Sequence, residues 1–361
     1  MKRKIVSVFA GFLLFSLLLA GCAGGKSVST QTKDAQENSK TVKTNDVTVG
    51  LLATTFGTQS FNDDVLAGLK KAEAEFGVKT IPLEDPEISN VVNSLRTLKD
   101  MGANLIIIPS AEQRDGLEIA AAEFPDVKFI YLAEIIEGDF NNIMSVVYRE
   151  NEAAFLAGAI GGLMTQTNSI GAVLANNEAL QLRYQYGYMA GARAVNQDID
   201  VQIAVANSFS DVGLGLELAG IMFGKGADFV GTYAGAVNLG VFEAASKAGD
   251  GKYVFGAANG QFDQMPDKII ASVVKPVDLM VFNLIQSYLN GEFEGGDAPK
   301  SLGLAEGGME LRWTPNEELL EIVPQEVIDT INELRDKIIS GEIEVPGIEE
   351  EYNSFTFSLA K

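Results

Sequence analysis

Short apolar runs and amphipathic segments alternate along the chain from about residue 47 onward. The first run, 47–52, is long enough for a buried strand and too short for a helix. A polar loop, TTFGTQSFND, follows it, and then comes a helix that ends at Gly77 and has its apolar residues on one face. Asn62 or Asp63 could cap this helix, whose free N–H groups would then point toward the loop. In open parallel sheets, ligands bind where such loops leave the carboxyl ends of the strands.

The same alternation of strand and helix continues to residue 147 and then starts again. A helix of unusually small residues at 150–164 separates the two runs and allows backbones to approach closely. The other predicted strands are 79–83, 104–109, 127–132, 143–147, 170–174, 201–205, 228–231, 253–257 and 269–274, and the other helices are 88–101, 112–123, 180–195, 211–224, 239–248, 278–289 and 324–340. This pattern predicts an α/β fold of two doubly wound parallel sheets with flanking helices. It is the architecture of a two-lobed periplasmic binding protein of type I.

Roughly 310 residues follow the polar N-terminal part, which is too many for one compact core. We therefore expect two lobes with a ligand between them. The predicted boundaries are a signal peptide at 1–21, a lipidated cysteine and flexible tether at 22–46, a first lobe at 47–148 and 275–304, and a second lobe at 149–274 and 305–361.

The N-terminus has the pattern of a bacterial export signal. Basic residues at 2–4 precede an apolar segment at 5–19, and Cys22 comes directly after Leu-Ala-Gly. This junction resembles the lipobox, where cleavage before the cysteine leaves it as a lipidated N-terminus. The polar segment 24–44 cannot bury a core and should be a tether. The alternative is a secreted protein with an incidental cysteine.

Composition narrows the chemistry that the protein can perform. The formal net charge is −22, so nucleic acid and anionic lipid would be repelled, and attachment to a membrane needs the lipid. There is no histidine, and Cys22 is the only cysteine. Catalysis by Ser-His-Asp or Cys-His and metal binding through imidazole are thereby excluded. We expect no enzyme activity, no metal and no cofactor, although a surface hydrolase that uses carboxylates stays an alternative.

Several short motifs match one known family in order and spacing over nearly all of the chain after the tether. They are Ser60-Phe61-Asn62 with Gly68 and Lys70-Lys71, Phe124-Pro125-Asp126 with Lys128-Phe129, Glu150 to Gly158 (ENEAAFLAG), Tyr184 with Gly187 and Gly191, Ser208-Phe209-Ser210-Asp211, Gly226-Ala227-Asp228, Ala234-Gly235, and Ala271 to Lys275 (ASVVK). On these residues the chain resembles the basic membrane protein family. Its members are lipoprotein receptors of ABC importers, typified by purine nucleoside receptor A.

The resemblance implies a ligand that is a nucleoside, with the base stacked on aromatic rings and the ribose held by carboxylates. The ligand-binding residues that it implies, together with their neighbours on the same loops, are Phe56, Ser60, Phe61, Asn62, Tyr184, Phe209, Tyr233, Asn259 and Lys275. Stacking of a base on an aromatic ring is worth about 1–3 kcal/mol in nucleic-acid binders, so one or two rings could provide the main contact. Each ring could instead belong to the core, most readily Phe209, and Lys275 could simply pair with Asp278.

Three positions depart from the family pattern. Thr58, Ala133 and Ala258 stand where the family has acidic residues, so the expected contacts to ribose are largely missing. A site that bonds hydroxyls discriminates by roughly 10⁴-fold, and losing those groups should change the ligand. Glu134 or Asn259 could compensate. A free base, or another flat heterocycle such as a flavin, fits the retained aromatic residues equally well.

The sequence thus predicts an extracytoplasmic substrate-binding protein of an ABC importer, anchored by lipid at Cys22. It would work as a monomer with a membrane permease and capture a small aromatic heterocycle, with a purine nucleoside or nucleobase as first choice. A ligand sensor that passes a signal to a membrane partner is the alternative from another class.

Overall fold

The computed structural model describes residues 46–359, except 58–60 and 297. The predicted signal peptide, Cys22 and nearly all of the predicted tether lie outside the described residues. Within the described ranges, no helix is both long enough and apolar enough to cross a membrane.

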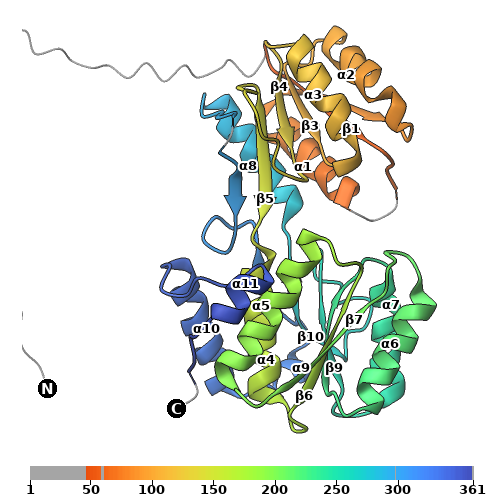
Figure 1. Cartoon of the computed structure of the whole chain (residues 1–361). Helices are drawn as coiled ribbons and strands as arrows, with labels where there is room; N and C mark the ends of the chain where they lie inside the picture. Colours follow the sequence, from red (N-terminus) through yellow and green to blue (C-terminus); the bar gives the residue numbers. More distant parts are fainter. Residues whose placement is uncertain (1–45, 58–60, 297, 360–361) are drawn as a thin grey trace, which may run out of the picture. The chain divides into compact units, whose positions relative to one another are not determined.

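The first sheet has six strands in the order β11-β5-β4-β3-β1-β2, and all of its strand pairs are parallel. Its strands β1, β3, β4 and β5 are labelled in Figure 1. The strands are β1 Thr48–Ala53, β2 Lys79–Glu84, β3 Leu105–Ile108, β4 Lys128–Tyr131, β5 Ile143–Tyr148 and β11 Lys300–Leu302. Its connections contain the helices α1 Phe61–Phe76, α2 Val91–Asp100 and α3 Arg114–Glu123, with short 3₁₀ turns η2 Ile88–Asn90 and η3 Ala111–Gln113 before the last two. A later helix, α8 Val277–Leu289, packs against α1.

The second sheet repeats this order with its own strands, β12-β10-β9-β8-β6-β7, and only β12 is antiparallel to its neighbour. The strands are β6 Ser169–Leu174, β7 Asp200–Val205, β8 Phe229–Tyr233, β9 Tyr253–Gly256, β10 Ile269–Val274 and β12 Glu310–Trp313. The helices are α4 Glu150–Met164, α5 Ala179–Val195, α6 Val212–Gly224, α7 Val237–Ala248, and the C-terminal α9 Glu317–Leu320, α10 Gln325–Ile339 and α11 Glu349–Ser354. Two doubly wound, mostly parallel sheets with flanking helices confirm the predicted fold class.

The strand order places a switch point at the same position in each sheet. In the first sheet the connections leave β1 and β3 toward opposite edges, and in the second sheet β6 and β8 do the same. A crevice forms at such a point outside the carboxyl ends of the strands, and it is where open α/β sheets bind ligands. The loops after β1 and β6 border these crevices and are therefore candidate ligand-binding loops.

Helices α4 and α5 come into contact through glycines. A Cβ atom at Gly191 would lie 1.8 Å from the carbonyl oxygen of Phe155, and one at Gly158 would lie 2.0 Å from that of Tyr188. Residues 150–162 of α4 are buried without interruption. The close approach predicted from the small residues of this helix is confirmed.

Two sequence expectations differ from the structure. Helix α1 begins at Phe61, so Asn62 and Asp63 lie in its first turn and are not its caps. Strands β11 and β12 were not predicted, because three or four residues are too few to show a period. The predicted strand at 79–83 does form, and β2 is an edge strand of its sheet, the position where a strand tolerates Pro82.

Candidate functional site

The loop after β1 is held in place by two side chains from the first turn of α1. The amide nitrogen of Asn62 donates to the carbonyl oxygen of Thr55 at 3.1 Å and to Oγ1 of Thr54 at 3.3 Å. The backbone N–H of Gly57 donates to Oδ1 of Asp63 at 2.7 Å. This part of the loop is therefore ordered by the helix that follows it, and the amide of Asn62 lies at the carboxyl end of β1.

The predicted aromatic residues near the loops differ in exposure. Phe56 and Phe61 are half-buried and lie against the edge of the main core cluster. Phe209, in the loop after β7, has 54% of its surface exposed, so the alternative that it belongs to the core is wrong. Its carbonyl oxygen accepts a hydrogen bond of 2.8 Å from the N–H of Ala236, which follows β8. Ser60 lies outside the described residues.

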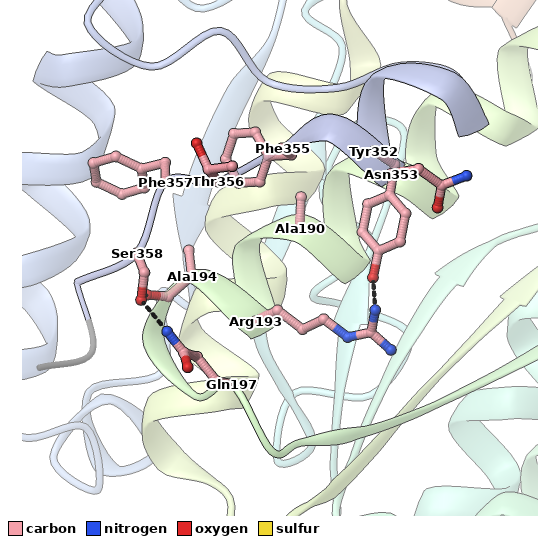
Figure 2. Close-up of a pocket in the computed structure, with 10 residues that line it drawn as sticks. All are labelled: Ala190, Arg193, Ala194, Gln197, Tyr352, Asn353, Phe355, Thr356, Phe357 and Ser358. Carbon is pink, nitrogen blue, oxygen red and sulfur yellow. Dashed lines mark hydrogen bonds between the residues drawn. The ribbon is translucent and has the colours of Figure 1, made fainter.

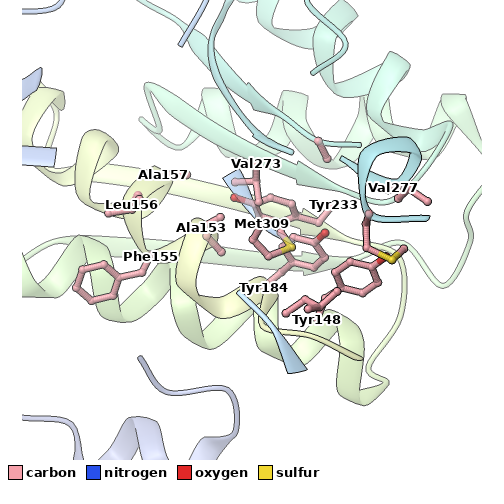
Figure 3. Close-up of a cluster of buried hydrophobic side chains, with 14 of the residues drawn as sticks. Tyr148, Ala153, Phe155, Leu156, Ala157, Tyr184, Tyr233, Val273, Val277 and Met309 are labelled. Atoms are coloured by element: carbon pink, nitrogen blue, oxygen red, sulfur yellow. The ribbon is translucent and has the colours of Figure 1, made fainter. Parts of the chain in front are cut away.

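Tyr184 and Tyr233 form a stacked pair in the core (Figure 3). Their ring centroids are 4.5 Å apart at an interplanar angle of 12°, and only 6% and 3% of the two residues are exposed. Burial raises the pKa of both hydroxyls well above the ordinary value. These rings contact each other, and a direct contact of either ring with ligand stays a prediction.

Lys275 follows β10 and contacts a carboxylate that the sequence analysis did not consider. Its Nζ lies 2.6 Å from Oε1 of Glu150, the first residue of α4, whose side chain is completely buried. Nε of Arg183 lies 2.5 Å from the other oxygen of Glu150. Burial by itself would raise the pKa of Glu150, but the charges of Lys275 and Arg183 outweigh it, and the pKa is lowered. The partner of Lys275 is thus Glu150 and not the neighbouring Asp278.

A hydrogen bond joins the loop after β9 to helix α1. Nδ2 of Asn259 donates to Oδ1 of Asp64. Burial raises the pKa of Asp64, the hydrogen bond from Asn259 lowers it, and the nearby charge of Asp278 raises it further, so that the balance lies above the ordinary value. In the same loop, the carbonyl oxygen of Ala258 accepts from the backbone N–H of Lys275 at 3.1 Å.

Sequence reasoning missed both Glu150 and Asp64. Glu150 opens a family motif, and Asp64 lies in the first turn of the helix after the β1 loop, so each had a positional signal. The sequence contains 49 acidic residues, most of which are expected on the solvated surface. No pattern in the sequence distinguishes these two from the others. Lys275 is 125 residues from Glu150 along the chain, and Asn259 is 195 residues from Asp64, so only the fold brings these pairs together.

The positions that depart from the family pattern have different surroundings. Ala133 is partly buried against the apolar cluster that covers the first sheet, whereas Ala258 is exposed. Glu134, which could have compensated for Ala133, is exposed and lies 3.6 Å from Arg114, measured from Oε2 to Nη1. Thr58 is not among the described residues.

Two cavities of about 480 Å³ each lie along the C-terminal segment. The first is formed by the last turns of α5 and residues 352–358, where Arg193 donates to the hydroxyl of Tyr352 and Gln197 donates to Ser358 at 3.1 Å (Figure 2). Neither cavity is lined by a predicted ligand-binding residue. Among the described residues, no group of three or more acidic, histidine or cysteine side chains could hold a metal ion.

The chain is similar to known ABC transporter substrate-binding proteins. A family model described as "ABC transporter substrate-binding protein PnrA-like" matches residues 47–349. Basic membrane protein A of Borreliella burgdorferi is 31% identical over 304 residues, which cover 83% of this chain and 88% of the relative. The ABC transporter nucleoside-binding protein BmpA of Lactococcus lactis is 28% identical over 367 residues, which cover 96% and 99% of the two chains.

A solved structure leads to the same class of protein. The solute-binding protein of an ABC transporter system from Aeropyrum pernix superposes with a TM-score of 0.71 at 26% identity, over 85% of this chain and 96% of that one. The match of the family model extends over both sheets and over the loops that leave β1, β9 and β10. The chain belongs to the PnrA-like family of ABC transporter substrate-binding proteins.

Proposed function

We propose that the protein captures a small aromatic heterocycle, a purine nucleoside or nucleobase, and delivers it to the permease of an ABC importer. The observation that carries the proposal is the set of groups at the carboxyl ends of the strands. The exposed ring of Phe209 follows β7, the amide of Asn62 follows β1, and the ammonium of Lys275 follows β10. A ring for stacking, an amide oxygen that can accept from a ring N–H, and an ammonium that can donate to ring oxygens and nitrogens suit a flat, nitrogen-rich ligand.

The ligand would lie between two lobes, 47–148 with 275–304 and 149–274 with 305–361. Phe56, Phe61 and Asn62 would contact it from the first lobe, and Phe209 and Asn259 from the second. The name of the Lactococcus lactis relative, a nucleoside-binding protein, supports the same ligand class. We also propose a monomeric, extracytoplasmic role, in which a single chain meets the permease at the membrane.

A lipid on Cys22 would keep the receptor at the membrane. The cysteine follows Leu-Ala-Gly after an apolar segment, and a polar tether separates it from the globular part. With a net charge of −22, the protein has no excess of positive charge to hold it on anionic lipid. Acylation supplies the attachment that this charge does not.

Calorimetry with two matched pairs of probes tests the ligand class. Guanosine is compared with guanine, and riboflavin with lumichrome. If stacking is the main contact, each pair should bind within about tenfold, a difference of roughly 1.4 kcal/mol. Buried carboxylates that hold a ribose would instead separate each pair by several kcal/mol, because removing the sugar leaves charged acceptors unpaired.

The exposed Ala258 offers a sharper form of this test. Its φ of 54° lies in the left-handed region, which Asp and Asn tolerate better than most residues. Ala258→Asp should shift the preference toward guanosine, whereas Ala258→Asn, with the same shape and no charge, is the control. If none of the four probes binds the wild type, the ligand class is wrong. Tight binding of guanosine together with no binding of guanine would show that other residues hold the sugar.

A further inference from the structure

A buried cluster of charged side chains lies where two connections between the sheets meet. Glu150 comes two residues after β5 ends, and Lys275 comes directly after β10. The first connection leads from β5 into α4, which packs on the second sheet, and the other leads from β10 into α8, which packs on α1. The ion pair between Glu150 and Lys275 therefore joins two segments that both connect the two sheets.

Each carboxylate oxygen of Glu150 forms an ion pair with a different cation. Oε1 lies 2.6 Å from Lys275 Nζ, and Oε2 lies 2.5 Å from Arg183 Nε. Only 13% of the Lys275 side chain and 26% of that of Arg183 are exposed, while the side chain of Glu150 is not exposed at all. A buried carboxylate without such partners would be strongly destabilising, and the two cations offset the cost of burying this charge. Two cations around one carboxylate leave the cluster with a net positive charge.

Aromatic rings fix the direction of Lys275 further. Its Nζ lies 4.7 Å from the ring centroid of Tyr148 and 5.7 Å from that of Tyr184. The backbone N–H of Lys275 donates a hydrogen bond to the carbonyl oxygen of Ala258, which lies in the same loop as Asn259. The ammonium is thus held by a carboxylate and by two ring faces, and the main chain is held by the loop after β9.

We infer that Glu150 is the positioning residue of the binding site, because it fixes the place and the charge of the ammonium that Lys275 presents to the ligand. This inference rests on the proposed function, in which Lys275 contacts the heterocycle. Glu150 itself is buried and does not reach a ligand. Its effect on affinity must therefore pass through Lys275.

A nearby carboxylate provides a matched control. Glu152, two residues further along α4, is also buried, but it pairs with Arg149 and accepts a hydrogen bond of 2.7 Å from the backbone N–H of Leu304. Glu150→Gln and Glu152→Gln make the same chemical change in the same helix. Both should lower the melting temperature, whereas only Glu150→Gln disturbs Lys275.

The affinity experiment is a double-mutant cycle measured with guanosine and guanine. Glu150→Gln should weaken binding at least about tenfold, and Glu152→Gln should change it less than about twofold. In a Lys275→Met background, Glu150→Gln should have almost no further effect. Equal losses with and without the lysine would overturn the inference, because the effect of Glu150 would then not act through Lys275. Glu150→Asp keeps the charge at a shorter reach and serves as the conservative variant, with an affinity between those of wild type and Glu150→Gln.

A second readout needs no ligand. The mobility of the Lys275 side chain, followed by NMR at its ε-carbon, should be low in wild type and Glu152→Gln and should increase in Glu150→Gln and, less strongly, in Glu150→Asp. A Lys275 that stays equally ordered in Glu150→Gln overturns the inference whether or not a probe binds. If Lys275 is released as expected but neither guanosine nor guanine binds the wild type, the positioning of Lys275 stands and the proposed ligand class fails.

Discussion

Four tyrosines of the main core cluster have hydroxyls whose charged form the fold disfavours. Burial raises the pKa of Tyr148, Tyr184, Tyr188 and Tyr233 above the ordinary value. The hydroxyls of Tyr148, Tyr188 and Tyr233 have no hydrogen-bond partner among the described residues. A buried neutral phenol without a hydrogen-bond partner already costs some stability, and a phenolate there would cost far more, because it would be a buried charge without a partner.

These tyrosines should make the protein unfold in alkali. Below an unfolded pKa of about 10 the hydroxyls are protonated in both states, and stability is unaffected. As the pH rises above that value, only the unfolded chain loses the protons, so stability falls by up to about 1.4 kcal/mol per pH unit for each group. Urea unfolding at increasing pH measures how steeply the free energy of unfolding falls. Tyr188→Phe removes one of the titrating groups and should reduce this slope by up to about 1.4 kcal/mol per pH unit. Tyrosinate absorbance that develops fully while the fold persists would contradict this expectation.

The packing of helix α4 against helix α5 depends on glycines, which have no side chain. Three glycines at this contact have backbone atoms of the facing helix where a Cβ would be, at 2.0 Å for Gly158, 2.3 Å for Gly187 and 1.8 Å for Gly191. Any side chain at these positions would push the helices apart. The start of α4 also holds Glu150, and the start of α5 holds Arg183. The close packing of the two helices therefore determines whether Arg183 can reach Glu150.

Alanine at two glycines should have opposite effects on stability. Gly191→Ala should lower the free energy of unfolding by about 3 kcal/mol or more, because the new Cβ meets a backbone carbonyl that cannot turn away. Gly220→Ala, on the exposed face of α6 with nothing within 4 Å, should raise it by up to about 1 kcal/mol. Urea unfolding of the two variants beside wild type makes the comparison. Equal and small effects would mean that α4 and α5 are not in backbone contact.

At the scale of the whole molecule, the negative net charge of the protein opposes its attachment to an anionic membrane. A net charge of −22 keeps the protein away from anionic lipid, yet a receptor gains from being held near its permease. The proposed lipid on Cys22 and the predicted tether would resolve this conflict, because they would hold the globular part, which the family match places from residue 47 onward, close to the membrane without docking it on the lipid surface.

Cys22→Ala should therefore release the protein from membranes without changing its fold. Fractionation of cells after a high-salt wash, with an unrelated lipoprotein as the loading control, measures the release. The soluble variant should unfold at the same urea concentration as the globular part prepared without its tether. Retention of the variant in the washed membrane fraction would rule out the lipid as the anchor.

The elements of the fold could be predicted from the sequence to within a few residues, because each leaves a local signal. A buried parallel strand such as β3 is a continuous apolar run, and α4 shows its close contacts in its small residues. Edge strands β11 and β12 leave no such signal in three or four residues. The candidate loops were also predictable, since they follow from strand order and from motifs that resemble the family.

The environment of each site residue was decided only by the tertiary structure. The sequence by itself determined that Phe209, Tyr184 and Lys275 lie on candidate loops and helices, but exposure and pairing depend on segments that are distant along the chain. Folding leaves Phe209 exposed, stacks Tyr184 on Tyr233, and brings Glu150 to a lysine 125 residues away. The physical reason is that the chemical type of a carboxylate or a ring does not determine its role. Its charge, contacts and access to ligand depend on what is packed around it, and periodicity along the chain contains no record of those neighbours.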